Sequence, residues 1–347
     1  MTAADPAPHV IALSGGVGGA KLVVGLARLL APDRLLVVAN TGDDFEHLGL
    51  TICPDADTLL YAGAALDNPA TGWGRRDETW TFMAVLDDLG GPNWFRLGDG
   101  DLALHVARTQ RLRAGEPLSA IIDDVRRRFG IGYRIVPMSD QPVRTWVDTD
   151  EGRLAFQDYF VRRRCEPSVS GLEFIGSSVA HAAPGLTEAQ GTADLEAVVI
   201  CPSNPLISVA PILAVPDLRF ALERSPAPIV AVSPLVGGRA LKGPAAKMMA
   251  ELGLGSDAVA IASFYTGLID GLIIDLADAD QKDAIEATGI AVLVVPTVMK
   301  DLEDRVALAG TVLEFASRLP RRDRTRRWRA PFQRKEPPAI REQKDVW

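Results

Sequence analysis

Short uninterrupted apolar runs occur in two stretches of the chain. They cover residues 9–13, 35–39, 197–201, 229–232, 272–274 and 291–295. Turn residues bound each run, as is typical of strands buried on both faces of a sheet. Helix-like segments separate the runs, and in the first of these Leu22, Leu26 and Leu29 recur at helical spacing. This alternation predicts an α/β fold, with a Rossmann-like, mostly parallel sheet and helices on both of its faces.

The middle of the chain has a different pattern. Residues 102–112 and 118–129 have helical periodicity. Apolar and polar residues then alternate at 143–147, 154–156 and 172–174, which predicts antiparallel strands with one solvated face. We therefore expect a helical and antiparallel-strand insertion between the two halves of the parallel sheet.

These patterns divide the chain into a core, an insertion and a tail. Residues 1–70 and 190–319 are expected to form the Rossmann-like core, and residues 71–189 the insertion. Residues 320–347 carry ten Lys or Arg and four Asp or Glu, a net charge of +6 that leaves −14 on the other 319 residues. An acidic body argues against a duplex-binding surface, so we expect no nucleic-acid partner. The basic tail either touches nucleic acid or a membrane or, as we favour, is solvated and partly flexible.

Composition adds only exclusions to this picture. The chain has 347 residues, of which 47% are hydrophobic and 24% charged, as in an ordinary globular protein. Its three cysteines are far apart and form no CxxC pair, which supports neither a disulfide framework nor a zinc finger. The apolar runs are too short to cross a bilayer, and the N-terminus does not resemble a signal peptide. We expect a soluble cytoplasmic protein with no membrane partner.

A glycine-rich turn joins the first predicted strand to the first predicted helix. It offers Gly15, Gly16, Gly18 and Gly19, followed by Lys21. Such a turn lets backbone N–H groups approach a phosphate at a helix N-terminus. It matches neither the P-loop nor the dinucleotide-binding pattern, because Lys21 is misplaced for both. The turn therefore either contacts phosphate or is a tight structural turn, and Lys21 either reaches the phosphate or is a surface lysine.

Four aspartates lie on two neighbouring segments after the second predicted strand. They are Asp43, Asp44, Asp55 and Asp57. Open α/β sheets bind ligands at this end of their strands, and clustered carboxylates suit a hard divalent cation. Asp55 or Asp57 would equally serve as a helix N-cap, and Asp43 as a turn residue.

Aromatic and polar groups on other predicted loops suit a heterocycle and a nucleotide. Trp73 and Trp94 could stack on a flat ring and Arg96 could pair with its oxygens, although tryptophans more often anchor a core. Two later loops follow predicted strands and suit hydrogen bonds, phosphate or base contacts; they carry Ser203, Asn204 and Ser208, and Gly237, Gly238 and Lys242.

The ordered set of motifs resembles that of the 2-phospho-L-lactate transferase family over about residues 9–300. The motifs are SGGVGGAK, NTGDD, CPDADT, GWGRRDETW, WFRLGDGDLA, VPMSD and PSNPLIS. The resemblance implies a magnesium-dependent step in the biosynthesis of the deazaflavin coenzyme F-420. A 2-phospholactate or phosphoenolpyruvate moiety would pass from a guanylyl-diphosphate donor to the terminal ribityl hydroxyl of the deazaflavin Fo, and GMP would leave. It also implies a homodimer.

The resemblance assigns roles to individual residues. Asp57 and Arg96, with Trp73, would contact Fo, and the insertion would complete the deazaflavin site. Asp43 and Asp57 would act in catalysis and bind Mg²⁺. The remaining candidates would face the nucleotide or its diphosphate; they are Gly15, Gly16, Gly18, Gly19, Lys21, Asn40, Ser203, Asn204, Gly238 and Lys242.

One departure and two alternatives accompany this interpretation. Family members often read LGDRDLA where this chain has Gly100, which removes a possible phosphate contact. A non-enzymatic nucleotide- or nucleotide-sugar-binding regulator of the YvcK type would share the glycine turn and the fold. It would not need Trp73 and Arg96. A dinucleotide-dependent oxidoreductase is disfavoured by Lys21, which occupies the position of the third glycine.

Overall fold

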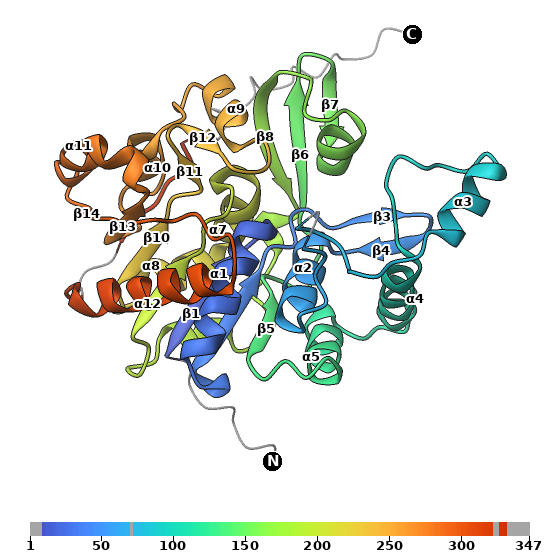
Figure 1. The fold of residues 1–347 in the computed structure, drawn as a ribbon, viewed down its shortest axis with the longest axis horizontal. Coiled ribbons are helices and arrows are strands. Elements are labelled where there is room, and N and C mark those ends of the chain that lie inside the picture. Colours follow the sequence, from blue (N-terminus) through green and yellow to red (C-terminus); the bar gives the residue numbers. More distant parts are fainter. Residues whose placement is uncertain (1–8, 70–71, 322–325, 332–347) are drawn as a thin grey trace, which may run out of the picture.

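The fold is built on a sheet of seven parallel strands, seen in a computed structural model that describes residues 9–69, 72–321 and 326–331 (Figure 1). From edge to edge the strands are β14 (Ala291–Val294), β13 (Gly271–Ile274), β10 (Ile229–Val232), β9 (Ala197–Ile200), β1 (Val10–Ser14), β2 (Leu35–Ala39) and β5 (Arg134–Pro137). Every pairing between neighbours is parallel. The predicted parallel sheet is therefore confirmed.

Both faces of the sheet are covered, which explains why its strands read as apolar runs. In β1, Val10 and Ala12 join the hydrophobic cluster on one face, while Ile11 and Leu13 join the cluster on the other. The first cluster includes side chains of four helices: α1 (Gly16–Leu29), α2 (Pro54–Gly63), α5 (Leu118–Arg128) and α12 (Leu302–Arg318). Because neither face meets water, both sets of strand side chains are apolar.

The second face carries more helices and a small antiparallel sheet. The helices are α6 (Leu186–Gln190), α7 (Ala210–Ala214), α8 (Pro216–Arg224), α9 (Ala245–Glu251), α10 (Ala258–Phe264) and α11 (Lys282–Glu286). The sheet has the order β7 (Gly152–Ala155), β6 (Arg144–Thr149) and β8 (Val169–Ile175), as the alternating pattern predicts.

The remaining elements lie beside the β5 end of the sheet or on connecting loops. Beside β5, Figure 1 shows α3 (Thr81–Asp88), α4 (Asp99–Arg113) and the hairpin of β3 (Phe45–His47) and β4 (Leu50–Ile52). A second hairpin pairs β11 (Leu235–Val236) with β12 (Arg239–Ala240). Helical turns cover Pro32–Arg34, Asp158–Arg162, Ser177–Val179, Pro205–Val209 and Leu276–Gln281. The helices predicted at 102–112 and 118–129 are confirmed as α4 and α5.

One part of the expected division is wrong. Residues 71–189 were expected to lie outside the parallel sheet, but β5 falls within them and pairs with β2. Its apolar core is only Ile135 and Val136, too short a run to stand out between helical and alternating segments. The insertion is therefore interrupted by an edge strand of the core sheet.

The order of the strands fixes where a ligand can bind. The chain runs from β1 to β2 on one side, and β9 later pairs with β1 on the other side. The loops that leave β1 and β9 therefore diverge at the carboxyl ends of adjacent strands. Open α/β sheets bind ligands at such a switch point. Among the described residues, no single helix is long and apolar enough to span a bilayer.

Two described residues of the tail pack against the body, and the expectation of a solvated tail is wrong for Arg326 and Trp328, which are both 4% exposed. The guanidinium of Arg326 pairs with Asp270 at 2.6 Å, with both side chains at most 2% exposed. The indole N–H of Trp328 donates to the carbonyl of Phe264 at 2.7 Å. Net basic charge did not reveal this contact, because one arginine and one tryptophan determine it. Residues 322–325 and 332–347 lie outside the described residues.

Substituting Trp328→Ala should lower the free energy of unfolding by about 3 kcal/mol, because the buried indole leaves a cavity and an unpaired carbonyl. Urea denaturation followed by circular dichroism measures this loss. Phe220→Ala is the control, since Phe220 is 55% exposed and should change stability by less than about 0.5 kcal/mol. Equal stability of the Trp328→Ala variant and the wild type would show that this segment does not pack in solution.

Candidate functional site

Asn40 follows β2 and joins three loops at the switch point. Its amide nitrogen donates to Asp55 Oδ2 at 2.8 Å and to the carbonyl of Ile207 at 3.1 Å. Its amide oxygen accepts the Gly42 N–H at 2.9 Å. Asp55 lies in the first turn of α2, and its Oδ1 accepts the Gly16 N–H at 2.6 Å. The segments that follow β1, β2 and β9 therefore meet on one amide and one carboxylate.

Three carboxylates lie close together at this point, and we call them the acid cluster. The protein compensates their charge only partly. Asp43, Asp44 and Asp55 are each at most 7% exposed. Burial, reinforced by the charge of Asp55, raises the pKa of Asp43 well above its usual range. Burial also raises the pKa of Asp55 to about 6, although the Asn40 hydrogen bond opposes the shift. It raises the pKa of Asp44 to about 7 against the opposing charge of Arg144.

Unsatisfied oxygens gather at the same place. Among the described residues, four buried side-chain oxygens have no hydrogen-bond partner here: Asp43 Oδ1, Asp44 Oδ1, Thr41 Oγ1 and Thr145 Oγ1. Thr145 is held against the loop by its N–H, which donates to the Gly42 carbonyl at 2.8 Å. Buried polar atoms without partners are rare, and carboxylate and hydroxyl oxygens are the ligands of hard cations. This donor set fits Mg²⁺.

The glycines of the first turn are required by close packing. A Cβ on Gly15 would lie 2.6 Å from Asp55 Oδ2, and one on Gly19 would lie 2.7 Å from Ser203 Oγ. A Cβ on Gly18 would collide with the Pro202 carbonyl, and Gly16 adopts φ +68°. The Gly15 N–H donates to Ser203 Oγ at 3.2 Å. The structural interpretation of the turn is thus supported, and phosphate contact by the next N–H groups of α1 stays a prediction.

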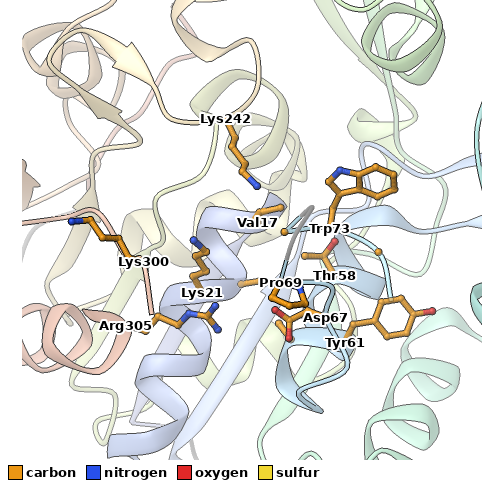
Figure 2. Close-up of a pocket in the computed structure, with 14 residues that line it drawn as sticks. Val17, Lys21, Thr58, Tyr61, Asp67, Pro69, Trp73, Lys242, Lys300 and Arg305 are labelled. Carbon is orange, nitrogen blue, oxygen red and sulfur yellow. The ribbon is translucent and has the colours of Figure 1, made fainter. Parts of the chain in front are cut away.

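Beside α1 lies a pocket rich in cations, which we call the basic pocket (Figure 2). Its charged lining residues are Lys21, Lys242, Lys300, Arg305 and Asp67, with Trp73 at its rim. Lys21 Nζ donates to the carbonyl of Met299 at 2.7 Å, so this lysine points into the pocket and not toward open solvent. Burial and the nearby charges of Arg305 and Lys242 lower the pKa of Lys21. Cations that repel one another in this way favour an anionic ligand.

Of the later predicted residues, Lys242 lines the basic pocket, whereas Asn204 and Gly238 have other surroundings. Asn204 Oδ1 accepts the Leu206 N–H at 3.0 Å, while its buried Nδ2 has no partner among the described residues. Gly238 lies in the turn between β11 and β12 with φ +71°. This hairpin is tied down by the Gly237 N–H, which donates to Asp278 Oδ2 at 3.1 Å. Lys242 follows the hairpin and reaches the basic pocket.

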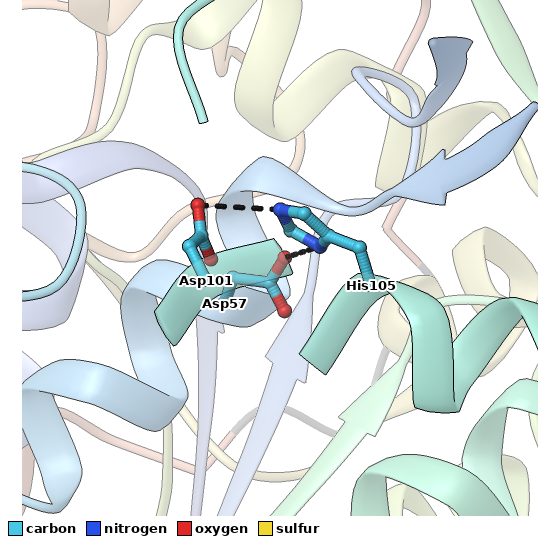
Figure 3. Close-up of side chains that lie close together, drawn as sticks. All are labelled: Asp57, Asp101 and His105. Atoms are coloured by element: carbon cyan, nitrogen blue, oxygen red, sulfur yellow. Dashed lines mark ion pairs between the residues drawn. The ribbon is translucent and has the colours of Figure 1, made fainter. Parts of the chain in front are cut away.

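Asp57, predicted to ligate the metal with Asp43, has a different surrounding. Both of its carboxylate oxygens bind Arg108, at 2.5 Å and 2.9 Å. Its neighbours His105 and Asp101 complete the cluster in Figure 3, whose ligand atoms lie within 4.8 Å of one another. The guanidinium of Arg108 already occupies the place of a cation between Asp57 and His105. The carboxylate beside Asp43 is that of Asp55, which the sequence offers both as one of four candidate cation ligands and as a helix cap.

Arg96, a predicted Fo contact, and Trp94, a candidate for stacking on a flat ring, both have partners within the protein. The guanidinium carbon of Arg96 lies 4.4 Å from the centre of the Trp80 ring. Trp94 packs in an aromatic cluster with Phe45 and His47 and does not line the basic pocket. Trp73 is 54% exposed and lines the basic pocket. Of these aromatic side chains, Trp73 is therefore the one presented to a ligand at the basic pocket.

Sequence reasoning missed Arg108, Lys300 and Arg305. Arg108 had a detectable signal, because Asp101, His105 and Arg108 are spaced by four and three residues and so share one helix face. Charged residues on the face that a helix buries need partners nearby. Lys300 and Arg305 had no detectable signal. They reach the basic pocket from the loop before α12 and from the first turn of that helix, far along the chain from Lys21.

Comparison with known proteins shows the family of the chain. A family model described as 2-phospho-L-lactate transferase CofD matches residues 10–301. A phosphoenolpyruvate transferase of Kitasatospora aureofaciens is 42% identical over 318 residues, which cover 90% of this chain and 98% of that protein. One of Streptomyces griseus is 40% identical over 314 residues, with 89% and 98% covered, and one of Mycolicibacterium smegmatis is 37% identical over 329 residues, with 88% and 98% covered.

A solved structure shares the fold at low sequence identity. A member of the UPF0052 family from Bacillus halodurans superposes with a TM-score of 0.57 at 14% identity, covering 89% of this chain and 99% of that one. The fold is thus shared beyond close relatives, whereas the family model and the curated relatives span nearly the whole described chain. On this evidence the chain belongs to the 2-phospho-L-lactate transferase CofD family.

Proposed function

We propose that the protein transfers a phosphoenolpyruvyl or 2-phospholactyl group from a guanylyl-diphosphate donor to the terminal ribityl hydroxyl of the deazaflavin Fo. The observation that carries the proposal is the meeting of a buried acid cluster and a basic pocket on either side of the glycine turn. This arrangement suits a diphosphate that must be held and neutralised while one of its phosphates is attacked. Family membership and relatives named phosphoenolpyruvate transferase support the same reaction.

The reaction needs little covalent help from the protein. The hydroxyl oxygen forms a bond to the phosphorus that bears the phosphoacid, and the bond from that phosphorus to the bridging oxygen breaks. GMP leaves with the bridging oxygen and its electron pair, and the hydroxyl loses its proton. Positioning and charge neutralisation therefore supply most of the acceleration. The cations of the basic pocket would hold the diphosphate, and Trp73 would stack on a ring at its rim.

Asp43 and Asp55 would hold Mg²⁺, with Asn40 fixing the Asp55 carboxylate. When bound, Mg²⁺ supplies positive charge to the diphosphate oxygens. In this proposal Asp57 still lies near Fo, as predicted. It does not bind Mg²⁺, and Asp55 takes that role, because Arg108 already balances the charge of Asp57. Asp44, whose pKa lies at about 7, is the carboxylate best suited to accept the hydroxyl proton.

We propose phosphoenolpyruvate as the native phosphoacid, because the relatives at 37–42% identity are named for it. The Gly100 departure also has a structural counterpart. A Cβ at Gly100 would collide with Nη1 of Arg75, so the guanidinium of Arg75 occupies the space into which a side chain at position 100 would extend. The positive charge that an arginine would bring at position 100 is thus present on Arg75.

A discontinuous assay tests the proposal. Purified protein, Mg²⁺, Fo and each guanylyl-activated phosphoacid are incubated, and GMP and the deazaflavin product are measured by mass spectrometry. We expect a product heavier by the phosphoacid moiety, formed faster with the phosphoenolpyruvyl donor. Failure of both donors, together with no Fo binding in an optical titration, would favour the nucleotide-binding regulator.

Removing the metal should make stability depend on pH. The pKa values of Asp44 and Asp55 are raised in the folded protein, so their contribution is present below their unfolded pKa and is lost as pH rises toward 7. In EDTA the free energy of unfolding should fall by about 1.4 kcal/mol per pH unit for each such carboxyl, from pH 4.5 to about pH 6 for Asp55 and to about pH 7 for Asp44. Mg²⁺ should restore it, and Asp55→Asn should flatten the profile while kcat falls on the order of 10²-fold. A flat wild-type profile in EDTA would contradict the acid cluster.

Removing a cation from the basic pocket should weaken the nucleotide donor. Arg305→Met and Lys21→Met should each raise the dissociation constant of GDP by about tenfold, measured by isothermal titration calorimetry, because a charge-assisted contact is lost. Fo binding should stay unchanged. Lys282→Met is the matched control, since Lys282 is an exposed lysine paired with Glu286 on α11. Unchanged GDP affinity in both variants would move the diphosphate away from this pocket.

A further inference from the structure

The first turn of α2 faces two different partners. Asp55 and Asp57 are two residues apart, so their side chains leave the helix about 200° apart. Asp55 turns to the glycine turn, where it accepts the Gly16 N–H at 2.6 Å. Asp57 turns to α4, where it meets Arg108 at 2.5 Å. One helical turn is thus held between the parallel sheet on one side and α4 on the other.

Arg108 is fixed more fully than an ordinary ion pair requires. It is 1% exposed and binds both oxygens of Asp57. Its Nε donates to the Thr51 carbonyl at 3.1 Å, and its Nη2 lies 2.7 Å from His105 Nδ1. A planar guanidinium with these partners has a single orientation. The geometry of the pair is therefore set by α4 and by the strand β4, which carries Thr51.

The contacts continue along the same face of α4 and return to α2. His105 Nε2 lies 3.2 Å from Asp101 Oδ2. The hydroxyl of Tyr61, in the second turn of α2, donates to Asp101 Oδ1 at 2.5 Å. Helix α2 is consequently attached to α4 at two points, Asp57 and Tyr61. Two points fix both the position of the helix and its rotation about its own axis.

We propose that Arg108 is a positioning residue for the transfer reaction. Through Asp57 it sets the rotation of the first turn of α2. This rotation directs the carboxylate of Asp55 toward Asp43 and the glycine turn. The inference rests on the proposed function, since it assigns Asp55 to the reacting centre. A displacement of about 1 Å at such a carboxylate costs on the order of 10²-fold in rate. Arg108 itself lies behind Asp57 and acts through it.

The test is the kinetics of Arg108→Lys, which keeps the charge but loses the two parallel hydrogen bonds. We expect a folded protein whose kcat falls on the order of 10²-fold, while KM for Fo and for the donor stays within about threefold. Arg111→Lys is the matched control on the next turn of α4, because Arg111 pairs with Glu116 and Asp124 and not with α2. It should turn over at the wild-type rate.

Each outcome has a distinct meaning. If Arg108 only holds the fold together, folded Arg108→Lys turns over at the wild-type rate, and the inference is overturned. If Arg108→Lys does not fold, the double variant Asp57→Asn with Arg108→Gln replaces the charged pair by two neutral amides. Reduced kcat with an unchanged KM for Fo in that folded variant supports the inference, because loss of an Fo contact at Asp57 would raise that KM. Wild-type kcat, or a loss confined to a raised KM for Fo, overturns it. Absence of product from the wild type measured in parallel would instead refute the proposed function.

Discussion

The hydrogen bonds of Asp55 are the constraint on which the site depends. Its carboxylate accepts the Gly16 N–H and the Asn40 amide, so it joins the turn after β1 to the loop after β2. The turn can approach this closely only because position 15 has no side chain, since a Cβ there would lie 2.6 Å from Asp55 Oδ2. The glycine turn is thus shaped first by the acid beneath it. Phosphate contact by the next N–H groups of α1 stays a prediction.

Acidic and basic side chains are separated around the contact between Asp55 and the glycine turn, and this separation lowers the stability of the protein without ligands. Carboxylates are buried on one side, and lysines and arginines converge on the other side in the basic pocket. Burial is the main reason why the pKa of Asp43 is raised and that of Lys21 lowered, and the like charges beside each of them add to the shift. A protein without ligands would be more stable without such clusters. Binding sites keep such clusters of like charge because the opposite charges of the ligand pair with them.

The insertion contributes position as well as surface. Helix α4 holds α2 in place because Arg108 binds Asp57 and Asp101 accepts the hydroxyl of Tyr61. Strand β6 holds the loop after β2, because the Thr145 N–H donates to the Gly42 carbonyl. The acid cluster is therefore enclosed by elements from both the core and the insertion. The mutual orientation of its carboxylates consequently depends on contacts between segments that are separated by about a hundred residues, as Gly42 and Thr145 are. Because these contacts lie between segments and not within the sheet, one parallel-sheet fold can carry different sites.

Periodicity in the sequence determined six strands of the parallel sheet, its two covered faces, α4 and α5, because buried parallel strands leave continuous apolar runs. The short edge strand β5 left no such run. The sequence also supplied four candidate aspartates without separating their roles. Only the tertiary structure decided that Asp55 meets the glycine turn and Asp57 meets Arg108, since the partners of both are distant in the chain. It likewise decided that Arg326 and Trp328 anchor the tail, and that Arg305 joins Lys21 in one pocket. Hydrophobic patterning is local and can be read in a short window, whereas the pairing of buried charges depends on which helices the fold brings together.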